Sequence, residues 1–308
     1  MPLLSIVLCT YNNAASLNKT LHQISRCTLP EDHNFELIVV DNNSPDNTLE
    51  IFDDIKGSIP FTSTYIFEKR QGLSHARNSG LSSAKGEYIL FTDDDAEIPE
   101  NWISDYVEAL LKYEPDCVYS RINIIWDQDK PWWFTSHYQP YFVHLDHGDS
   151  EQVVTDYHKE FYGKNFCVRK SVLIQIGGFN PELGRQGDKL LAGEETVIYR
   201  KLIDLHKKVV YIPSPMVGHR LKAREYESAN IEKLYIDGAY SNYALAKIFA
   251  KRTLLGRPTY PLISATRALL VHTPKLLLNV ANRKMRFYHL LNIKQNLIWA
   301  FSYNAVAI

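Results

Sequence analysis

Apolar residues in the first hundred positions gather into three short runs that are flanked by polar segments. The runs are LLSIVLC at 3–9, ELIVVD at 36–41 and EYILF at 87–91. Continuous apolar runs of this length, rich in β-branched residues, predict strands that are covered on both faces. We therefore expect a buried sheet in the first third of the chain.

The polar segments between these runs predict helices. The first segment carries an approximately helical apolar stripe formed by Ala15, Leu17, Leu21 and Ile24. In the second segment, Ser44 is placed to cap a helix that Pro45 would open. A third helix is predicted from about residue 74 to residue 84. Strands that alternate with helices indicate parallel pairing and right-handed crossovers.

Polar residues follow each predicted strand at the point where the strand ends. They are Thr10, Tyr11 and Asn12 after the first strand, Asp41, Asn42 and Asn43 after the second, and Asp93, Asp94 and Asp95 after the third. The carboxyl ends of parallel strands meet at one edge of a sheet, and open sheets of this kind bind ligands at that edge. The sequence therefore predicts a binding site there.

The aspartate triplet requires a positive partner, because adjacent carboxylates beside a core repel one another. Mg²⁺ and Mn²⁺ prefer carboxylate oxygens, and Mg²⁺ is usually held by one or two of them together with phosphates and waters. A triplet at a strand end therefore suits a metal that bridges a diphosphate. The alternative is a solvated turn before a helix opened by Pro99, whose first turn favours acids.

The composition, 45% hydrophobic and 22% charged, is that of a globular protein. Its four cysteines show no CxxC spacing, which argues against a zinc ribbon or a disulfide framework and fits a reducing compartment. No apolar run reaches the ~18 residues that a spanning helix needs, and the first residues lack the basic start of a signal peptide. A cytoplasmic protein is expected, with attachment to a membrane surface left open.

Charge divides the chain near residue 220. From Arg220 to the end, 14 Lys and Arg face 4 Asp and Glu, whereas the preceding residues hold 20 against 31. The prediction is a first domain at 1–220 and a basic, mainly helical extension at 221–308. The extension mixes apolar and basic residues as interfacial helices do, and a helical lid with its basic residues in water is the alternative.

Four further features bear on the chemistry or the packing of the chain. Arg77 lies in KRQGLSHARNSG, a glycine-containing basic segment suited to cradling a nucleotide. GEET at 193–196 offers two acids, which equally suit the first turn of the helix ETVIYRKL. A lone histidine such as His219 is more often structural than functional, and Trp132 with Trp133 is either a stacking platform for a ligand or part of the core.

Six segments resemble, in this order, the successive motifs of the family 2 glycosyltransferases with the GT-A fold. They are SIVLCTYNN, VVDNNSPDNT, QGLSHARNSG, GEYILFTDDDAEIPENW, GKNFCVRKSVLIQIGGFNPELGRQG and LLAGEETVIYRKL. The resemblance covers about residues 3–220. It implies an α/β, Rossmann-like fold with a mixed, mostly parallel sheet flanked by helices, followed here by the helical extension.

The resemblance also implies roles for single residues. The nucleotide and donor sugar would contact Thr10, Tyr11, Asn12, Asp41, Arg77, Asp93, Asp94 and Arg185. Asp95 would bind the metal, and His219 would contact the metal or the diphosphate. Glu195 stands where the family usually has an aspartate as catalytic base, and its extra methylene leaves Glu194 as the alternative.

The function implied is that of an inverting glycosyltransferase that requires Mn²⁺ or Mg²⁺. It would move a sugar from a nucleotide sugar, with a UDP-sugar as the first expectation, to a hydroxyl of a glycan or lipid-linked glycan in cell-surface polysaccharide synthesis. No nucleic acid is expected as a partner, and the basic extension would contact an anionic membrane on its cytosolic face. A catalytically silent nucleotide-sugar or glycan-binding module is the alternative, followed by a nucleotidyltransferase.

Overall fold

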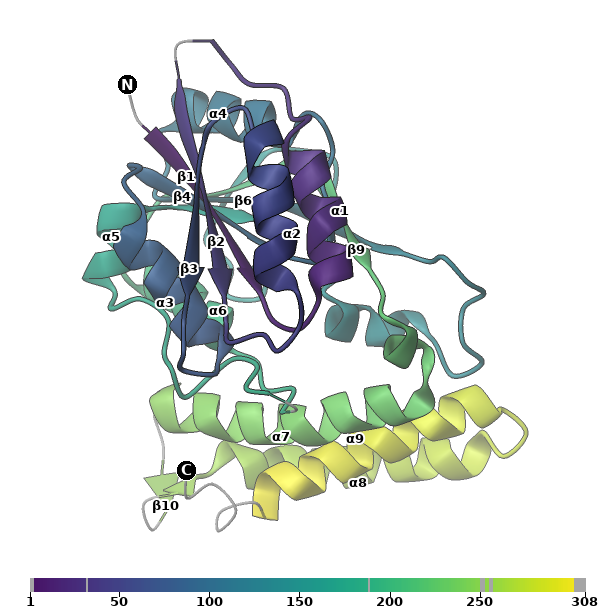
Figure 1. Ribbon diagram of the computed structural model, residues 1–308. Coiled ribbons are helices and arrows are strands. Elements are labelled where there is room, and N and C mark those ends of the chain that lie inside the picture. Colours follow the sequence, from purple (N-terminus) through teal and green to yellow (C-terminus); the bar gives the residue numbers. More distant parts are fainter. Residues whose placement is uncertain (1–2, 32, 188, 250–252, 255–256, 302–308) are drawn as a thin grey trace. The chain divides into compact units, whose positions relative to one another are not determined.

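The computed structural model describes residues 3–31, 33–187, 189–249, 253–254 and 257–301. The chain forms two compact units (Figure 1). The first unit comprises Met1–Ile125, Phe142–Glu182 and Glu194–Arg220. The second comprises Trp126–Tyr141, Leu183–Gly193 and Leu221–Ile308, so two early segments belong with the end of the chain.

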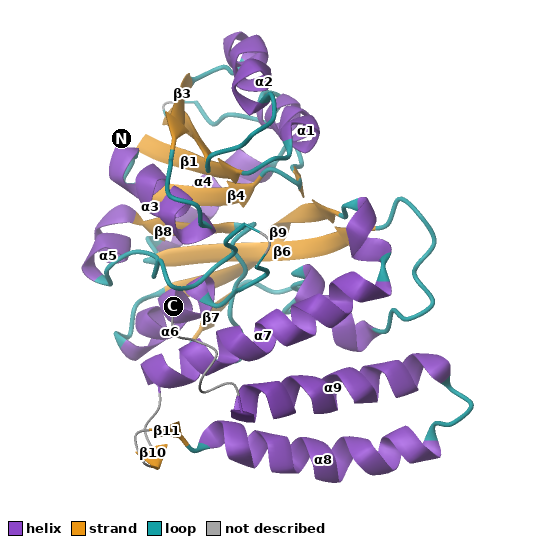
Figure 2. Ribbon diagram, turned by 60° about the horizontal axis from the view of Figure 1, so that its bottom comes forward, coloured by secondary structure: helices purple, strands orange, loops and turns teal. Residues whose placement is uncertain are grey.

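A single mixed sheet forms the centre of the first unit (Figure 2). Its strands are β1 Leu3–Thr10, β2 Asn34–Asp41, β3 Thr62–Phe67, β4 Tyr88–Asp93, β5 Ala96–Glu97, β6 Cys117–Ile125, β7 Gln152–Val154, β8 Phe166–Arg169 and β9 Val209–Arg220. They lie in the order β3-β2-β1-β4-β8-β6-β9-β5, and β7 also pairs with β9. The strands β5, β7 and β8 run against the other six. The sheet is therefore mixed and mostly parallel, as predicted.

Helices cover both faces of this sheet. They are α1 Ala14–Ile24, α2 Thr48–Ile55, α3 Leu73–Ser83, α4 Trp102–Tyr113, α5 Lys170–Gln175 and α6 Glu194–Asp204, with a short 3-10 turn η1 at Lys56–Ser58. Side chains of β1 alternate between two cores: Leu4, Ile6 and Leu8 pack with α1, α2 and α4, while Val7 and Cys9 pack with α3, α5 and α6. Burial on both faces explains why the run at 3–9 is continuously apolar.

The three predicted strands are confirmed as β1, β2 and β4, and the third predicted helix is confirmed as α3. The predicted cap is wrong, because α2 begins at Thr48 rather than at Pro45. Ser44 instead belongs to a turn in which its backbone N–H donates to Asp41 Oδ1 at 2.9 Å. Its hydroxyl accepts a hydrogen bond from the backbone N–H of Asn12, so this turn ties together the ends of β1 and β2.

Long helices form most of the second unit. They are α7 Ser228–Phe249, α8 Tyr260–Leu278 and α9 Arg283–Phe301. The unit also contains most of the 3-10 turn η2 Ser136–Phe142, whose last residue belongs to the first unit, and the 3-10 turn η3 Ala223–Tyr226. A short strand pair, β10 Thr253–Leu254 and β11 Arg257–Pro258, lies between α7 and α8 in the sequence. Aromatic side chains join the early segments to α7: Tyr141 stacks on Tyr235 at 4.4 Å between ring centroids. Trp133 is buried and its indole N–H donates to the carbonyl of Tyr226. Trp133 is therefore core, whereas Trp132 is exposed beneath the guanidinium of Arg283.

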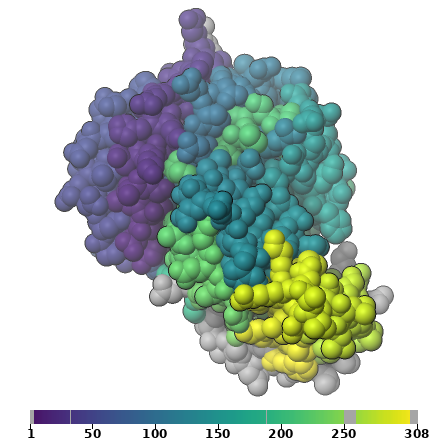
Figure 3. Space-filling view, turned by 90° about the vertical axis from the view of Figure 1, so that its right-hand side faces the viewer, coloured from purple at the N-terminus to yellow at the C-terminus, as the bar shows by residue number. Residues whose placement is uncertain are grey.

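Helix α8 turns its small residues inward and its large ones outward. Its buried residues are Pro261, Ala265 and Ala268. Its exposed large apolar residues are Tyr260, Leu262, Ile263, Leu269, Leu270, Val271, Leu277 and Leu278. The charged residues of α8 are Arg267 and Lys275, both basic and exposed. Figure 3 shows the surface of α8 and α9 in green-yellow and yellow.

None of the described helices combines the length and the hydropathy that crossing a membrane requires.

Candidate active site

The ends of β1 and β4 are locked together through Asp94. Its carboxylate accepts hydrogen bonds from the hydroxyl of Thr10 at 2.8 Å and from the side-chain amide of Asn13 at 2.6 Å. Its backbone carbonyl accepts a further bond from the hydroxyl of Thr20 on α1. The buried Asp94 thus fixes α1 against the strand ends, and its two carboxylate oxygens already have protein donors.

Asp41, at the end of β2, is held in a similar way. Its Oδ2 accepts a hydrogen bond from the hydroxyl of Tyr65 on β3 at 2.5 Å, and its Oδ1 accepts the Ser44 N–H described above. Next to it, Tyr11 is exposed, and Asn12 is exposed with a left-handed backbone. At this edge of the sheet Tyr11 and Asn12 are therefore accessible to a ligand, whereas Thr10 and Asp41 are buried and hydrogen-bonded to protein groups.

Asp95 lies between a lysine and a histidine. Its Oδ1 is in contact with the ammonium of Lys164, which also lies 3.5 Å from Asp93 Oδ2. Its Oδ2 lies 3.7 Å from Nε2 of His219. The Lys164 side chain is only 3% exposed. Burial alone would lower the pKa of Lys164, but Asp95 and Asp93 together raise it above the usual lysine value, so the ammonium remains charged.

His219 is oriented by a hydrogen bond on its far side. Its Nδ1 lies 3.0 Å from the carbonyl oxygen of Phe142. Because a carbonyl can only accept, Nδ1 carries the proton, and in the neutral ring the Nε2 lone pair faces Asp95. A lone pair and a carboxylate oxygen that face each other form a donor set which a cation placed between them would satisfy.

The residues present could supply two of the ligands of a divalent cation. No group of three or more His, Cys, Asp and Glu side chains arranged to hold a metal occurs in the part of the chain that the structure describes. Asp95 and His219 would supply two ligands, so phosphate and water would have to supply the others, which is how Mg²⁺ is usually bound.

Arg77 of α3 is the centre of a second ionic cluster. Its Nη1 lies 2.9 Å from Glu194 Oε1 and 2.8 Å from Glu195 Oε1, and its Nη2 lies 3.3 Å from Asp93 Oδ1. The Arg77 side chain is 1% exposed, so its charge is balanced by these carboxylates rather than by water. The two acids at the start of α6 are thereby brought to the aspartates at the end of β4.

Glu194 and Glu195 differ in their surroundings although both contact Arg77. The Glu194 side chain is 3% exposed and that of Glu195 is 15% exposed. Burial and the neighbouring charge of Glu195 raise the pKa of Glu194, and Arg77 offsets this only in part. Glu194 therefore holds its proton to a higher pH than an ordinary glutamate.

Gly163 packs directly against the side chains of Arg77 and Glu195. A Cβ atom at Gly163 would lie 1.9 Å from Nη2 of Arg77 and 2.2 Å from Oε1 of Glu195. Real Cβ atoms do not approach other atoms so closely, so only glycine fits while Arg77 and Glu195 keep their positions. The sequence reasoning missed this residue and Lys164, which stand side by side in GKN.

Arg185 and Asn165 are not among the residues that these contacts join. Arg185 belongs to the second unit, where it is exposed. The amide of the buried Asn165 accepts from Trp102 and Tyr106 and donates to the carbonyls of Arg121 and Pro215, which makes it a structural link.

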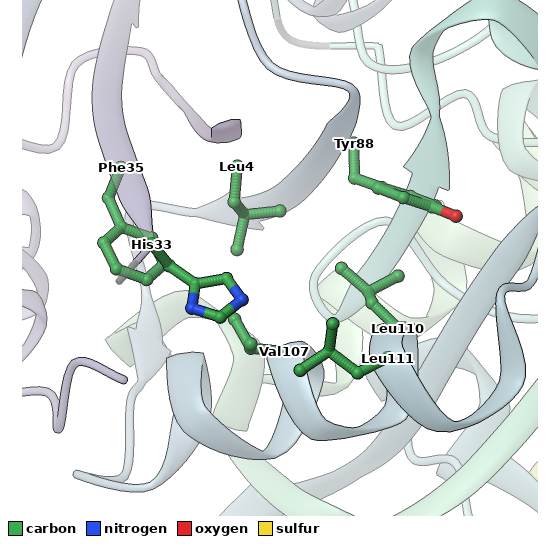
Figure 4. A pocket seen from close by; sticks show the side chains of 7 residues that line it. All are labelled: Leu4, His33, Phe35, Tyr88, Val107, Leu110 and Leu111. Atoms are coloured by element: carbon green, nitrogen blue, oxygen red, sulfur yellow. The ribbon is translucent and has the colours of Figure 1, made fainter. Parts of the chain in front are cut away.

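An apolar hollow lies at the opposite edge of the sheet, at the amino ends of β1, β2 and β4 (Figure 4). It is lined by Leu4, His33, Phe35, Tyr88, Val107, Leu110 and Leu111. The polar groups described above follow the carboxyl ends of the same strands, so this hollow is no part of their cluster.

Comparison with known proteins gives a consistent result. Residues 5–179 match the family "Glycosyl transferase family 2". A glucosyl-dolichyl phosphate glucuronosyltransferase of Haloferax volcanii is 25% identical over 222 residues, which is 70% of this chain and 69% of that protein. The chain spans only 40% and 38% of the length of two further curated relatives, a second Haloferax volcanii glycosyltransferase and one from Streptococcus pneumoniae.

Two solved structures share the fold. A mannosyltransferase of Pyrobaculum calidifontis in complex with GDP-Man and Mn²⁺ superposes with a TM-score of 0.65 and 18% identity, covering 98% of this chain and 88% of that one. Staphylococcus aureus TarS in complex with UDP-GlcNAc superposes with a TM-score of 0.56 and 15% identity, covering 94% and 90%. The first unit thus has the GT-A architecture predicted from its motifs. With the family matched over more than half of its length, the chain belongs to glycosyl transferase family 2.

Proposed function

We propose that the chain is an inverting, metal-dependent glycosyltransferase that transfers a sugar from a nucleotide sugar to a hydroxyl of a glycan or lipid-linked glycan. The observation that carries the proposal is the pair of ionic clusters at the sheet edge, in which Asp93, Asp95, Glu194 and Glu195 are held by two buried cations. Carboxylates with separate partners can serve separate roles, one set toward a metal and diphosphate and another toward a proton.

Glu195 is assigned as the base that accepts the proton of the attacking hydroxyl. A sugar hydroxyl is a weak nucleophile at neutral pH, so a carboxylate within hydrogen-bond reach must take its proton as it attacks the anomeric carbon. Glu195 is the more exposed of the two acids. Burial and the neighbouring Glu195 raise the pKa of Glu194, so Glu194 retains its proton to a higher pH, and we assign it to holding Arg77 in place. Direct attack of this kind inverts the anomeric centre.

Asp95 and His219 are the residues that would hold Mn²⁺ or Mg²⁺. Such an ion, when bound, stabilises the charge on the departing nucleoside diphosphate. We assign the nucleotide to Tyr11 and Asn12, together with the neighbouring Thr10 and Asp41, and UDP is the first candidate. Arg77 is assigned to positioning Glu195 rather than to the nucleotide, because three carboxylates surround its guanidinium. Asp94 acts through Thr10, whose hydroxyl donates to its carboxylate.

We assign a lipid-linked glycan as the acceptor, in a reaction that serves cell-surface polysaccharide synthesis. The Haloferax volcanii relative is named for a dolichyl phosphate substrate, which supports a lipid-linked acceptor. The outward apolar face of α8, whose charged residues are both basic, supports attachment to an anionic membrane. Attachment of that kind would bring the enzyme to such an acceptor.

The test is a donor-hydrolysis and transfer screen over UDP- and GDP-sugars with Mn²⁺ or Mg²⁺, which reads released diphosphate. Glu195→Gln is expected to retain donor affinity and to lose turnover by about 10²–10⁴, the usual contribution of a positioned general base. Asp95→Asn is expected to abolish transfer and to weaken metal-dependent binding of UDP with the fold intact.

Glu194→Gln is the matched control, since it changes the neighbouring acid on the same guanidinium. If Glu194→Gln loses turnover in the manner expected for Glu195→Gln, the base is Glu194. If no nucleotide sugar is hydrolysed or transferred although UDP or GDP binds, the chain is a binding module and the enzymatic proposal fails.

A further inference from the structure

Lys164 is a buried charge that the reaction described above does not use. It precedes β8, and its ammonium contacts one carboxylate oxygen of Asp95 while lying 3.5 Å from Asp93. The other oxygen of Asp95 faces His219. One aspartate thus has a fixed cation on one side and the proposed metal position on the other.

Two positive charges cannot share a carboxylate without cost. The Lys164 ammonium already contacts the carboxylate that would hold a divalent ion, and its 3% exposure leaves little water to screen the repulsion between the two positive charges. The diphosphate of a donor brings negative charge to the same place and offsets that repulsion.

We propose that Lys164 is an internal competitor for the metal ion, which makes divalent-cation binding dependent on the donor diphosphate. The inference rests on the proposed function and adds a mechanism for ordering its ligands. Without nucleotide, the ammonium occupies Asp95 and keeps the affinity for a metal low. A nucleoside diphosphate would supply negative charge that offsets the ammonium, so Asp95 and His219 would hold a divalent ion more tightly in its presence.

A positioning role for the same lysine gives the opposite expectation. If Lys164 served only to orient Asp95 as a ligand, its removal would weaken metal binding by about 10- to 100-fold, as the loss of hydrogen bonds to metal ligands commonly does. Competition by a full charge at close range acts on a doubly charged ion and outweighs that effect. The direction of the change therefore decides between the two.

The experiment measures binding of Mn²⁺ to the full-length protein by electron paramagnetic resonance, alone and with UDP or GDP. In the absence of nucleotide, Lys164→Met is expected to bind Mn²⁺ at least about 10-fold more tightly than the wild type does. The factor by which nucleotide tightens Mn²⁺ binding is expected to fall correspondingly. Lys164→Arg keeps the charge and is expected to retain the weak binding of Mn²⁺ alone.

Lys201→Met is the matched control, because its ammonium donates to the carbonyl of Ile176 rather than to an aspartate. Circular dichroism establishes that each variant is folded. Unchanged or weaker binding of Mn²⁺ alone by folded Lys164→Met would overturn the proposal. If neither UDP nor GDP affects Mn²⁺ binding by the wild type, metal binding does not depend on the diphosphate and the proposal is likewise overturned. Failure of the proposed function is distinguished from this outcome by the absence of transfer and of donor hydrolysis in the diphosphate assay.

Discussion

At the scale of single residues, the packing of Gly163 against Arg77 gives a sharp prediction. Gly163→Ala would force Arg77 away from at least one of its three carboxylates, because the new Cβ would overlap its guanidinium. We expect a loss of about 1–3 kcal/mol in the free energy of unfolding, as for other overpacked sites, together with a loss of transfer. Urea unfolding and the diphosphate assay measure the two effects.

Gly57→Ala is the matched control, since a Cβ at Gly57 meets nothing within 4 Å. Gly163→Ala with wild-type stability and turnover would mean that the cluster around Arg77 is loose enough to move.

The aspartate triplet shows which contacts of single residues can be predicted from the sequence and which cannot. The repulsion among Asp93, Asp94 and Asp95 correctly indicates that positive or donor groups must lie nearby, and these prove to be Arg77, Lys164 and the donors on Thr10 and Asn13. Lys164 lies 69 positions from Asp95, and no local pattern marks it as a partner. The family motifs named Arg77, but its three carboxylate contacts follow only from the fold.

At the scale of elements, α8 exposes its large apolar residues and buries only Pro261, Ala265 and Ala268. Leu270 and Leu277 lie on its outward face. Replacing both by serine is expected to weaken binding to anionic liposomes by more than about 10²-fold, because each leucine that enters the interface contributes about 1.5–3 kcal/mol. The remaining binding is expected to be reversed by high salt, since Arg267 and Lys275 act through electrostatic attraction.

Liposome sedimentation measures this effect. The control replaces Leu49 and Leu205, two leucines of the first unit that are each 49% exposed, and is expected to bind like the wild type. Equal sedimentation of both variants would remove α8 as the attachment surface and favour the lid interpretation of the basic extension.

Local patterns predicted the buried strands better than they predicted the edge of the sheet. The runs that became β1, β2 and β4 are covered on both faces and therefore continuously apolar. The edge strand β3, TSTYIF, lies largely at the surface and carries polar residues, so its sequence resembles a loop. Its Tyr65 holds Asp41, so the missed strand also concealed one contact of the site.

At the scale of the whole molecule, the second unit is built from three separate parts of the chain. A fragment that ends at residue 220 keeps two of these parts but lacks the residues that cover them. Trp133 would lose the carbonyl of Tyr226, Tyr141 would lose the ring of Tyr235, and the backbone N–H of Leu190 would lose Asp237. We expect this fragment to aggregate and to bind a hydrophobic dye strongly.

A fragment that ends at residue 249 retains α7 and is the comparison, because it keeps all three of those partners. Weaker dye binding by the shorter fragment than by the longer one would contradict the assignment of the early segments to the second unit. The change of charge near residue 220 could not reveal these early segments, since their aromatic residues give no sign of a distant partner.

Glu194 lies 117 positions after Arg77, so the ribosome releases the two residues at different times. Strands β1 to β4 are complete once residue 93 has left the ribosome, and at about 5–20 residues per second Glu194 follows roughly 5–20 s later. During that interval Asp93 is the only one of the three carboxylate partners of Arg77 to have left the ribosome. We infer that the ends of β1, β2 and β4 form before the proposed base and His219 can join them, which proteolysis of chains stalled with residue 195 inside or outside the ribosome would test.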